Sequence, residues 1–211
     1  LDSATTGAEL GDIDVIAAGA GAPDENLTYS LEVAATGSSM VFGRGGFSVE
    51  PIHTVGETIG DYTPPGILDG LGAFELDAST VRVLANHELL HFRGYPYEIT
   101  FGTSGSFTMT GARVSYFDID KNSRQIVASG LAYNTIYNAD GVFATDRGFL
   151  AHNLAGFSRL CSSQLVEKHQ FGNGRGLENT IYFTGEEDGG FYNPVGGAVW
   201  ALDIETGHFW H

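Results

Sequence analysis

The sequence is poor in basic residues, and this shortage limits its partners. Only 10 Lys and Arg stand against 26 Asp and Glu in 211 residues, so the formal net charge is −16. A field of this sign repels phosphodiester backbones and anionic lipid, which argues against nucleic acid and membrane surfaces as partners. Carboxylates are the hard oxygen ligands that Ca²⁺ and Mg²⁺ prefer, so the charge favours divalent cations as partners.

Cysteine and long apolar runs are also scarce. Cys161 is the single cysteine, which excludes an internal disulfide framework and any multi-cysteine metal site. We expect this thiol to pack as a small apolar side chain. No stretch reaches the roughly 18 apolar residues of a membrane span, so no membrane-spanning helix is predicted.

Helical periodicity is nearly absent, and short strand-like runs take its place. The one helical window is 159–169, and it is short. Runs rich in Val, Ile, Tyr, Phe and Thr alternate with turns rich in Gly, Asn and Asp, as expected of strands on a half-buried sheet. These predicted strands are 48–55, 81–86, 113–119, 125–133, 180–184 and 198–204. The sequence therefore predicts an all-β protein.

A repeat suggests which all-β fold this is. The segments that begin at Gly111 and Gly196 resemble each other, and a third copy begins at Gly72. The aspartates Asp77, Asp118 and Asp203 follow the strand of each copy, 41 and 85 residues apart. These spacings are one and two steps of a unit of about 40–45 residues, which is the period of β-propeller blades. We therefore predict a propeller, with a β-sandwich or barrel as the alternative.

The repeat length also predicts the domain organisation. Residues 61–211 would supply four to five blades of an incomplete ring, and the copy expected near residue 160 is not recognisable. The last hairpin stops at Trp210-His211, so we expect it to lack its returning strand. We interpret the chain as an N-terminal piece of a longer protein, truncated at its C-terminus, or as a chain whose last strand comes from another molecule. Residues 1–60 would form an N-terminal arm or outer strands.

Asn86-His87-Glu88 forms the first candidate site, at the end of a predicted strand. Strand alternation places Asn86 and Glu88 on one side and His87 on the other. An amide oxygen and a carboxylate two residues apart can share a hard cation. The alternative is a strand end with a solvated Glu88.

Two further segments concentrate charge. Glu186, Glu187 and Asp188 follow another predicted strand, and three adjacent acids favour either a bound cation or a solvated turn. Arg159 and Arg175 are notable because cations are scarce. Each guanidinium could bind an oxyanion or form a local ion pair.

These residues together resemble a known family. The segments Leu68–Phe74, Val81–Glu88, Gly111–Asp118, Thr184–Glu187 and Gly197–Asp203 are similar to motifs of the PhoX-type alkaline phosphatases, in the same order. The similarity is greatest to a branch of that family often found in cyanobacteria, and it spans about residues 66–207.

The resemblance implies an exported, extracellular or periplasmic six-bladed propeller that hydrolyses phosphate monoesters at a calcium and iron cluster. Glu88, Glu186 and Glu187 would then bind metal. Gly185 stands where the family carries a cysteine that binds iron, so calcium is expected rather than iron. Asn86 would lie beside the metal, and we assign Arg159 and Arg175 with it to substrate binding.

The leading hypothesis is therefore a calcium-dependent phosphatase-like propeller, or a catalytically altered relative, acting on a phosphorylated small molecule. The alternative is a non-enzymatic, calcium-stabilised extracellular or surface propeller, which the missing cysteine favours. A third hypothesis is a lactonase- or phytase-like propeller that uses calcium with other substrates.

Overall fold

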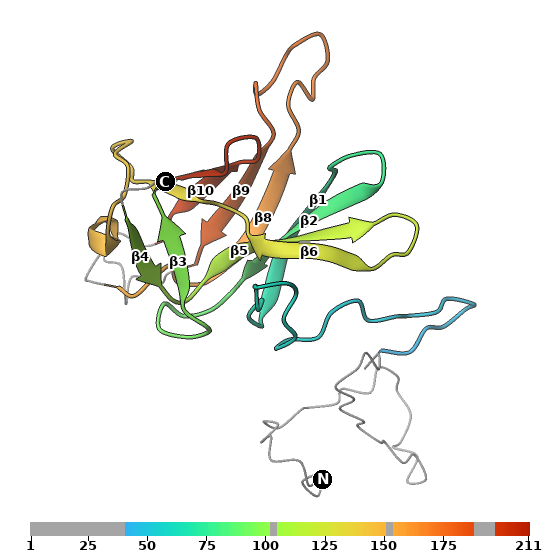
Figure 1. The fold of residues 1–211 in the computed structure, drawn as a ribbon. Helices are drawn as coiled ribbons and strands as arrows, with labels where there is room; N and C mark the ends of the chain where they lie inside the picture. The colour runs from blue at the N-terminus through green and yellow to red at the C-terminus, as the bar shows by residue number, and fades with distance from the viewer. Residues whose placement is uncertain (1–40, 102–104, 151–153, 188–196) are drawn as a thin grey trace, which may run out of the picture. The chain divides into compact units, whose positions relative to one another are not determined.

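A computed structural model describes residues 41–101, 105–150, 154–187 and 197–211 of the chain. These residues belong to one compact unit, Ala35–His211. They form eleven strands and one turn of 3₁₀ helix, η1 (Arg147–Phe149), with no α-helix in the described ranges. The prediction of an all-β protein is confirmed (Figure 1).

The first sheet has four antiparallel strands in the order β1-β2-β5-β6. Its strands are β1 (Leu68–Glu75), β2 (Thr80–His87), β5 (Arg113–Asp120) and β6 (Ile126–Leu131). A separate hairpin, β3 (Tyr97–Thr100) with β4 (Ser106–Met109), is inserted between β2 and β5. Apart from this insertion, each strand pairs with the next along the chain.

The second sheet has five strands in the order β7-β11-β10-β9-β8. Its strands are β7 (Thr135–Tyr137), β8 (Leu160–Val166), β9 (Ile181–Glu186), β10 (Val199–Asp203) and β11 (His208–Trp210). Strands β8 to β11 form an antiparallel meander, and β7 adds to it in parallel beside β11. Neither sheet closes on itself.

The two sheets begin with the same local geometry. In the first, Leu68 pairs with His87, and the register then shifts before Leu71. In the second, Leu160 pairs with Glu186, and the register shifts before Ser163. A bulge of this kind turns side chains away from the regular alternation. The sheets are therefore structural repeats, with Leu160 in the place of Leu68.

The residue before each first strand strengthens this equivalence. Ile67 and Arg159 both have a left-handed backbone, with φ of 56° and 53°. The carbonyl of Ile67 accepts a hydrogen bond from Glu88 N, and that of Arg159 accepts one from Glu187 N, both at 2.8 Å. Glu88 and Glu187 consequently occupy corresponding positions at one end of the two sheets.

The first strands of the two sheets, β1 and β8, lie side by side (Figure 1). Glycines permit the close approach, because a Cβ at Gly70 would lie 2.5 Å from the Cys161 carbonyl oxygen and one at Gly72 would lie 2.8 Å from the Tyr182 ring. The core formed with these strands includes the fully buried Leu84, Tyr182, Phe157, Leu202 and Phe209. Burial of each such side chain contributes about 1.5–3 kcal/mol.

The repeat spacing predicted from the sequence was partly wrong. Asp118 and Asp203 do occupy corresponding places, since Asp118 pairs with Arg82 and Asp203 with Ile181 in the matching strand pairs. Asp77, however, follows β1 in the same sheet as Asp118. The 41-residue spacing therefore joins two hairpins of one sheet, and the described residues hold two such sheets rather than four to five blades.

The helical window 159–169 was also wrong, because Leu160–Val166 is the strand β8. Residue burial alternates along most of β8, and β9 supplies its hydrogen-bond partners. This strand is the copy that the sequence repeat failed to locate near residue 160. Pairing with β9 thus overrides the helical pattern, as tertiary context commonly does.

Two more expectations change at the ends of the described chain. Residues 48–55 form no strand, and Pro51 lacks the N–H that a ladder would need. The last hairpin does have a returning strand, because β11 pairs with β10. Within the predicted arm 1–60, residues 1–40 lie outside the described ranges.

Among the described residues, no helix has the length and hydrophobicity of a membrane span.

Candidate metal centre

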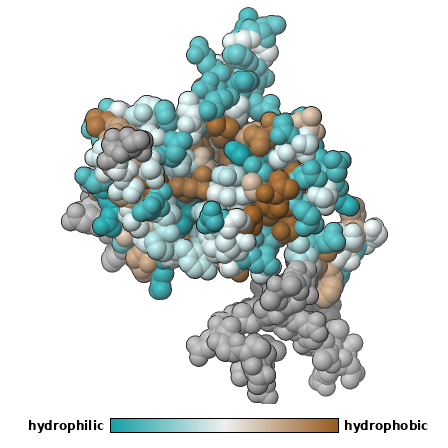
Figure 2. All heavy atoms as spheres, viewed as in Figure 1, coloured by the Kyte–Doolittle hydropathy of each residue, from teal (hydrophilic) through white to brown (hydrophobic). Residues whose placement is uncertain are grey.

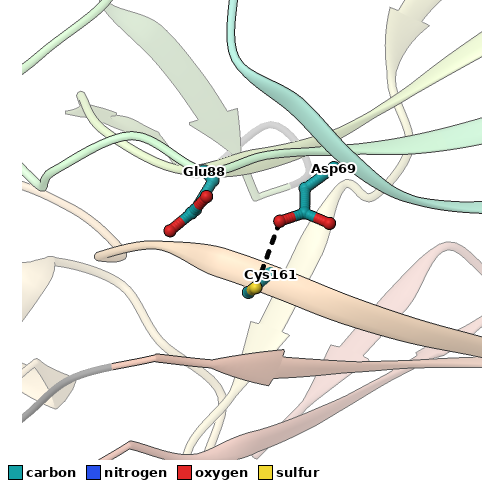
Figure 3. Close-up of side chains that lie close together, drawn as sticks. All are labelled: Asp69, Glu88 and Cys161. Carbon is teal, nitrogen blue, oxygen red and sulfur yellow. Dashed lines mark hydrogen bonds between the residues drawn. The ribbon is translucent and has the colours of Figure 1, made fainter. Parts of the chain in front are cut away.

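Three potential metal ligands converge where the first strands of the two sheets meet. Asp69 comes from β1, Glu88 directly follows β2, and Cys161 comes from β8; their ligand atoms all lie within 4.8 Å of one another (Figure 3). Asp69 and Cys161 lie in the corresponding bulges of the two sheets. The repeated geometry therefore turns a carboxylate and a thiol toward the same point.

The Cys161 thiol is held as a hydrogen-bond donor in this cluster. Its Sγ donates to Asp69 Oδ2 at 3.1 Å. This hydrogen bond, together with desolvation and the negative charges of Asp69, Glu88 and Glu187, raises the pKa of Cys161 to about 11. Without a cation the thiol is protonated at neutral pH, because a thiolate would add negative charge beside these carboxylates.

Arg159 lies between two of the acids that the sequence assigned to metal binding. Its Nε donates to Glu88 Oε1 at 3.0 Å and its Nη2 to Glu187 Oε2 at 2.6 Å. These two carboxylates raise the pKa of the guanidinium, with the hydrogen bond to Glu88 as the largest cause. Ion pairs this exposed add little stability, so a divalent ion can compete for Glu88.

Glu186 is turned away from Glu88 and Glu187. Its carboxylate accepts hydrogen bonds from Ser158 N at 2.8 Å and from Trp200 Nε1 at 3.3 Å. Adjacent residues of an extended strand point to opposite faces, so Glu186 and Glu187 diverge. The structure does not gather Glu88, Glu186 and Glu187 into one set of ligands.

Asn86 lies beneath the cluster, fully buried between the sheets. Its Nδ2 donates to the Cys161 carbonyl at 2.6 Å and to Thr184 Oγ1 at 2.8 Å, and its Oδ1 accepts from the Tyr182 hydroxyl at 3.0 Å. Its polar atoms are thus engaged, and substrate has no access to it. Asn86 instead fixes the backbone of Cys161, as a satisfied buried network can.

His87 points to the opposite face from Asn86 and Glu88, as strand alternation predicts. Its ring nitrogens lie 3.1 Å from the Gly66 carbonyl and 2.7 Å from Ser115 Oγ. Burial is the main cause that lowers the pKa of His87 to about 4. His87 is therefore a neutral structural residue at physiological pH.

Arg175 lies far from this cluster along the second sheet. It belongs to the loop 167–180 that joins β8 to β9, which extends from the sheets in Figure 1. Because Leu160 pairs with Glu186 at one end of this hairpin and Val166 with Ile181 at the other, the loop lies at the opposite end from the cluster. Of the two arginines assigned to substrate, only Arg159 is at the site.

Sequence reasoning missed Asp69, and its expectation that Cys161 packs as a small apolar side chain was wrong, because the thiol donates a hydrogen bond to Asp69. A signal for them was present, since Ile67-Leu68-Asp69 and Arg159-Leu160-Cys161 precede equivalent strands. This similarity was not recognised because the segment from Arg159 was interpreted as a helix. A helix and a strand have different residue periods, so the two segments were not compared as equivalent strands.

The donor set has a definite chemical preference. Calcium takes six to eight oxygen ligands, whereas a thiolate selects softer divalent ions such as those of zinc and iron. The two carboxylates and one thiol of Asp69, Glu88 and Cys161 therefore fit a transition metal better than calcium. Gly185 leaves no thiol on β9, but Cys161 supplies one from the neighbouring strand.

An open hollow of about 610 Å³ adjoins this cluster. It shares two residues with the site, Glu88 and Arg159, and is otherwise lined by Ile67, Leu89, Leu90, Arg93 and Gly94. A small molecule in this hollow would contact both a ligand of the candidate metal and the guanidinium beside it.

Comparisons with known proteins identify no relative. No family model matches the chain, and neither a curated protein nor a solved structure matches it.

Proposed function

We propose that this protein is a metal-dependent phosphatase-like hydrolase of phosphate monoesters, with its metal held by Asp69, Glu88 and Cys161. The observation that carries the proposal is the convergence of these three side chains from both sheets beside Arg159 and an open hollow. The motif resemblance to PhoX-type phosphatases supports the choice of substrate and an exported setting.

The proposal includes a β-propeller, of which the described sheets would be two blades. Two features support this fold. Each sheet contains a four-stranded antiparallel meander, and the first strands of the two meanders lie side by side. Blades of a propeller are four-stranded sheets arranged around a central channel.

Each residue of the site would have a separate role in the proposed reaction. A bound divalent ion would polarise a phosphoryl oxygen and lower the pKa of a bound water. Asp69 and Glu88 would hold the ion through their carboxylates, and Cys161 would release its proton on binding it. Arg159 uses Nε and Nη2 on Glu88 and Glu187, and its remaining N–H groups are suited to a phosphoryl oxygen.

The test is hydrolysis of p-nitrophenyl phosphate by the full chain after loading with zinc, iron(II) or calcium. We expect turnover that chelation abolishes and that Cys161→Ser and Glu88→Gln each reduce about 100-fold or more. Glu178→Gln is the matched control, because Glu178 is exposed in the loop at the far end of β8 and β9. Absence of chelator-sensitive turnover with all three metals would overturn the enzymatic proposal.

One observation favours a second candidate, the non-enzymatic calcium-stabilised propeller. Arg159 already neutralises part of the charge of Glu88 and Glu187, which an enzyme would need for metal or substrate. Calorimetry distinguishes the two proposals. Calcium binding that raises the melting temperature, without binding of a phosphate analogue such as vanadate, would support the second candidate and count against hydrolysis.

A further inference from the structure

The hollow beside the cluster has an apolar wall. Leu89 is buried, Leu90 is half-buried, and Ile67 exposes 59% of its surface. Apolar patches interrupt the polar surface elsewhere too, as Figure 2 shows on one face of the molecule. The wall at Ile67 differs from these patches because it adjoins Glu88 and Arg159, which belong to the candidate site.

The backbone of Ile67 has a conformation that is unfavourable for its side chain. Its φ of 56° is in the left-handed region, which is a genuine outlier for a β-branched residue. The surrounding backbone holds this conformation, because Glu88 N donates to the Ile67 carbonyl at 2.8 Å. Strained residues of this kind cluster at ligand and active sites. The equivalent residue of the second sheet is Arg159, which also lines the hollow.

Two arginine side chains line the hollow. Arg93 lines it with its guanidinium 5.1 Å from the centre of the Phe92 ring, and Arg159 lines it beside Glu88. An anionic group beside Arg159 and the proposed metal, and an apolar group against Ile67, Leu89 and Leu90, would therefore both meet complementary surfaces.

We propose that this hollow binds the organic group of the substrate and that the preferred substrates are aryl or bulky alkyl phosphate monoesters. The inference rests on the proposed function, because the phosphoryl group is placed at Arg159 and at the metal that Glu88 would help to hold. Ile67 is then a specificity-determining residue, and its strained backbone serves to present an apolar side chain beside the reacting group.

The experiment compares binding of phenylphosphonate and methylphosphonate to the metal-loaded full chain by calorimetry. Both are stable to hydrolysis, so binding is measured apart from turnover. We expect phenylphosphonate to bind about tenfold more tightly or better, because the ring is removed from water against Ile67, Leu89 and Leu90. The variant Ile67→Asn should remove most of this advantage, because it should weaken phenylphosphonate binding much more than methylphosphonate binding. Asn accepts a left-handed backbone, so the variant should fold.

Leu177→Asn is the matched control, because Leu177 is a partly exposed leucine in the loop at the far end of β8 and β9. The Leu177→Asn variant should keep the full preference for phenylphosphonate over methylphosphonate. Equal affinity for the two phosphonates in the wild-type chain, or an Ile67→Asn variant that keeps the preference, would overturn the inference. Turnover of p-nitrophenyl phosphate with equal binding would overturn the inference alone, whereas selective binding without turnover would overturn hydrolysis alone.

Discussion

At the scale of single residues, the chemistry of the cluster depends on the pair formed by Asp69 and Cys161. The thiol donates to the carboxylate, and this contact is the main cause that raises the pKa of Cys161 to about 11. A divalent cation reverses the local charge and favours the thiolate. The same two residues that hold a proton in the free protein are therefore suited to exchange it for a metal.

The first prediction concerns Asp69→Asn in metal-free protein. The change removes a negative charge and a carboxylate acceptor, so the pKa of Cys161 should fall toward its ordinary value. Since each pKa unit changes the thiolate fraction about tenfold below the pKa, alkylation by iodoacetamide at mildly alkaline pH should accelerate about tenfold or more. The measurement is the alkylation rate against pH.

Glu178→Gln serves as the control for this charge change, because it removes an exposed carboxylate at the far end of the β8–β9 hairpin. It should leave the alkylation rate unchanged. If Asp69→Asn also leaves the rate unchanged, Asp69 does not govern the thiol and the described contact is wrong.

Glu88 and Arg159 were identifiable from the sequence, because an acid after an apolar strand and a rare cation are visible in it. The divergence of Glu186 from Glu187 could also be expected from strand alternation. Asp69 and Cys161 could not be identified without the pairing of the two sheets, since their meeting depends on bulges in β1 and β8. Local pattern does not report which strands are neighbours in space.

At the scale of strands, the site depends on how closely β1 approaches β8. Gly70 and Gly72 leave no side chain between the strands, and the Tyr182 hydroxyl bridges the gap by donating to the Gly70 carbonyl at 2.9 Å. The same hydroxyl lies 3.0 Å from Asn86 Oδ1, so its one proton is shared between these two acceptors. The distance between Asp69 and Cys161 is therefore fixed by packing beneath them.

The second prediction tests this approach with Gly72→Ala. The new Cβ would lie 2.8 Å from the Tyr182 ring, and Tyr182 is held by its hydrogen bonds, so the strands must separate. We expect the free energy of unfolding to fall by about 1–3 kcal/mol, the usual cost of overpacking. The measurement is equilibrium denaturation in guanidinium chloride.

Gly185→Ala is the matched comparison for this variant. Its Cβ would meet only the Ser162 hydroxyl, at 3.2 Å, and that side chain is exposed and able to rotate. Its unfolding free energy should therefore stay within about 0.5 kcal/mol of the wild type. Equal stability of the two variants would contradict the close packing of β1 on the second sheet.

Strands with strong β-branched and aromatic character were predictable. Strands β6 and β10 lie wholly within predicted runs, and most of β2, β5 and β9 coincides with others. Strand β8 was not, because its segment Cys-Ser-Ser-Gln contains none of the β-branched and aromatic residues that indicate strands. What makes it a strand is its pairing with β9.

At the scale of the whole molecule, the cluster joins the two sheets. Asp69 and Glu88 belong to the first sheet and Cys161 to the second, so a bound ion would link elements about 70–90 residues apart in the chain. The net charge of −16 includes many solvated acids, but Asp69 has no cationic partner among the described ion pairs. The proposed divalent cation would supply positive charge beside Asp69.

The most direct test of this account is a titration of the metal-free full chain with cobalt(II). Because Cys161 is the single cysteine, sulfur-to-cobalt charge-transfer absorption in the near ultraviolet reports ligation by that residue alone. We predict that the band saturates at one equivalent, weakens in Asp69→Asn and Glu88→Gln, persists in Glu178→Gln and is displaced by zinc. Cobalt binding without a charge-transfer band, or no binding at all, would contradict the metal centre at Asp69, Glu88 and Cys161.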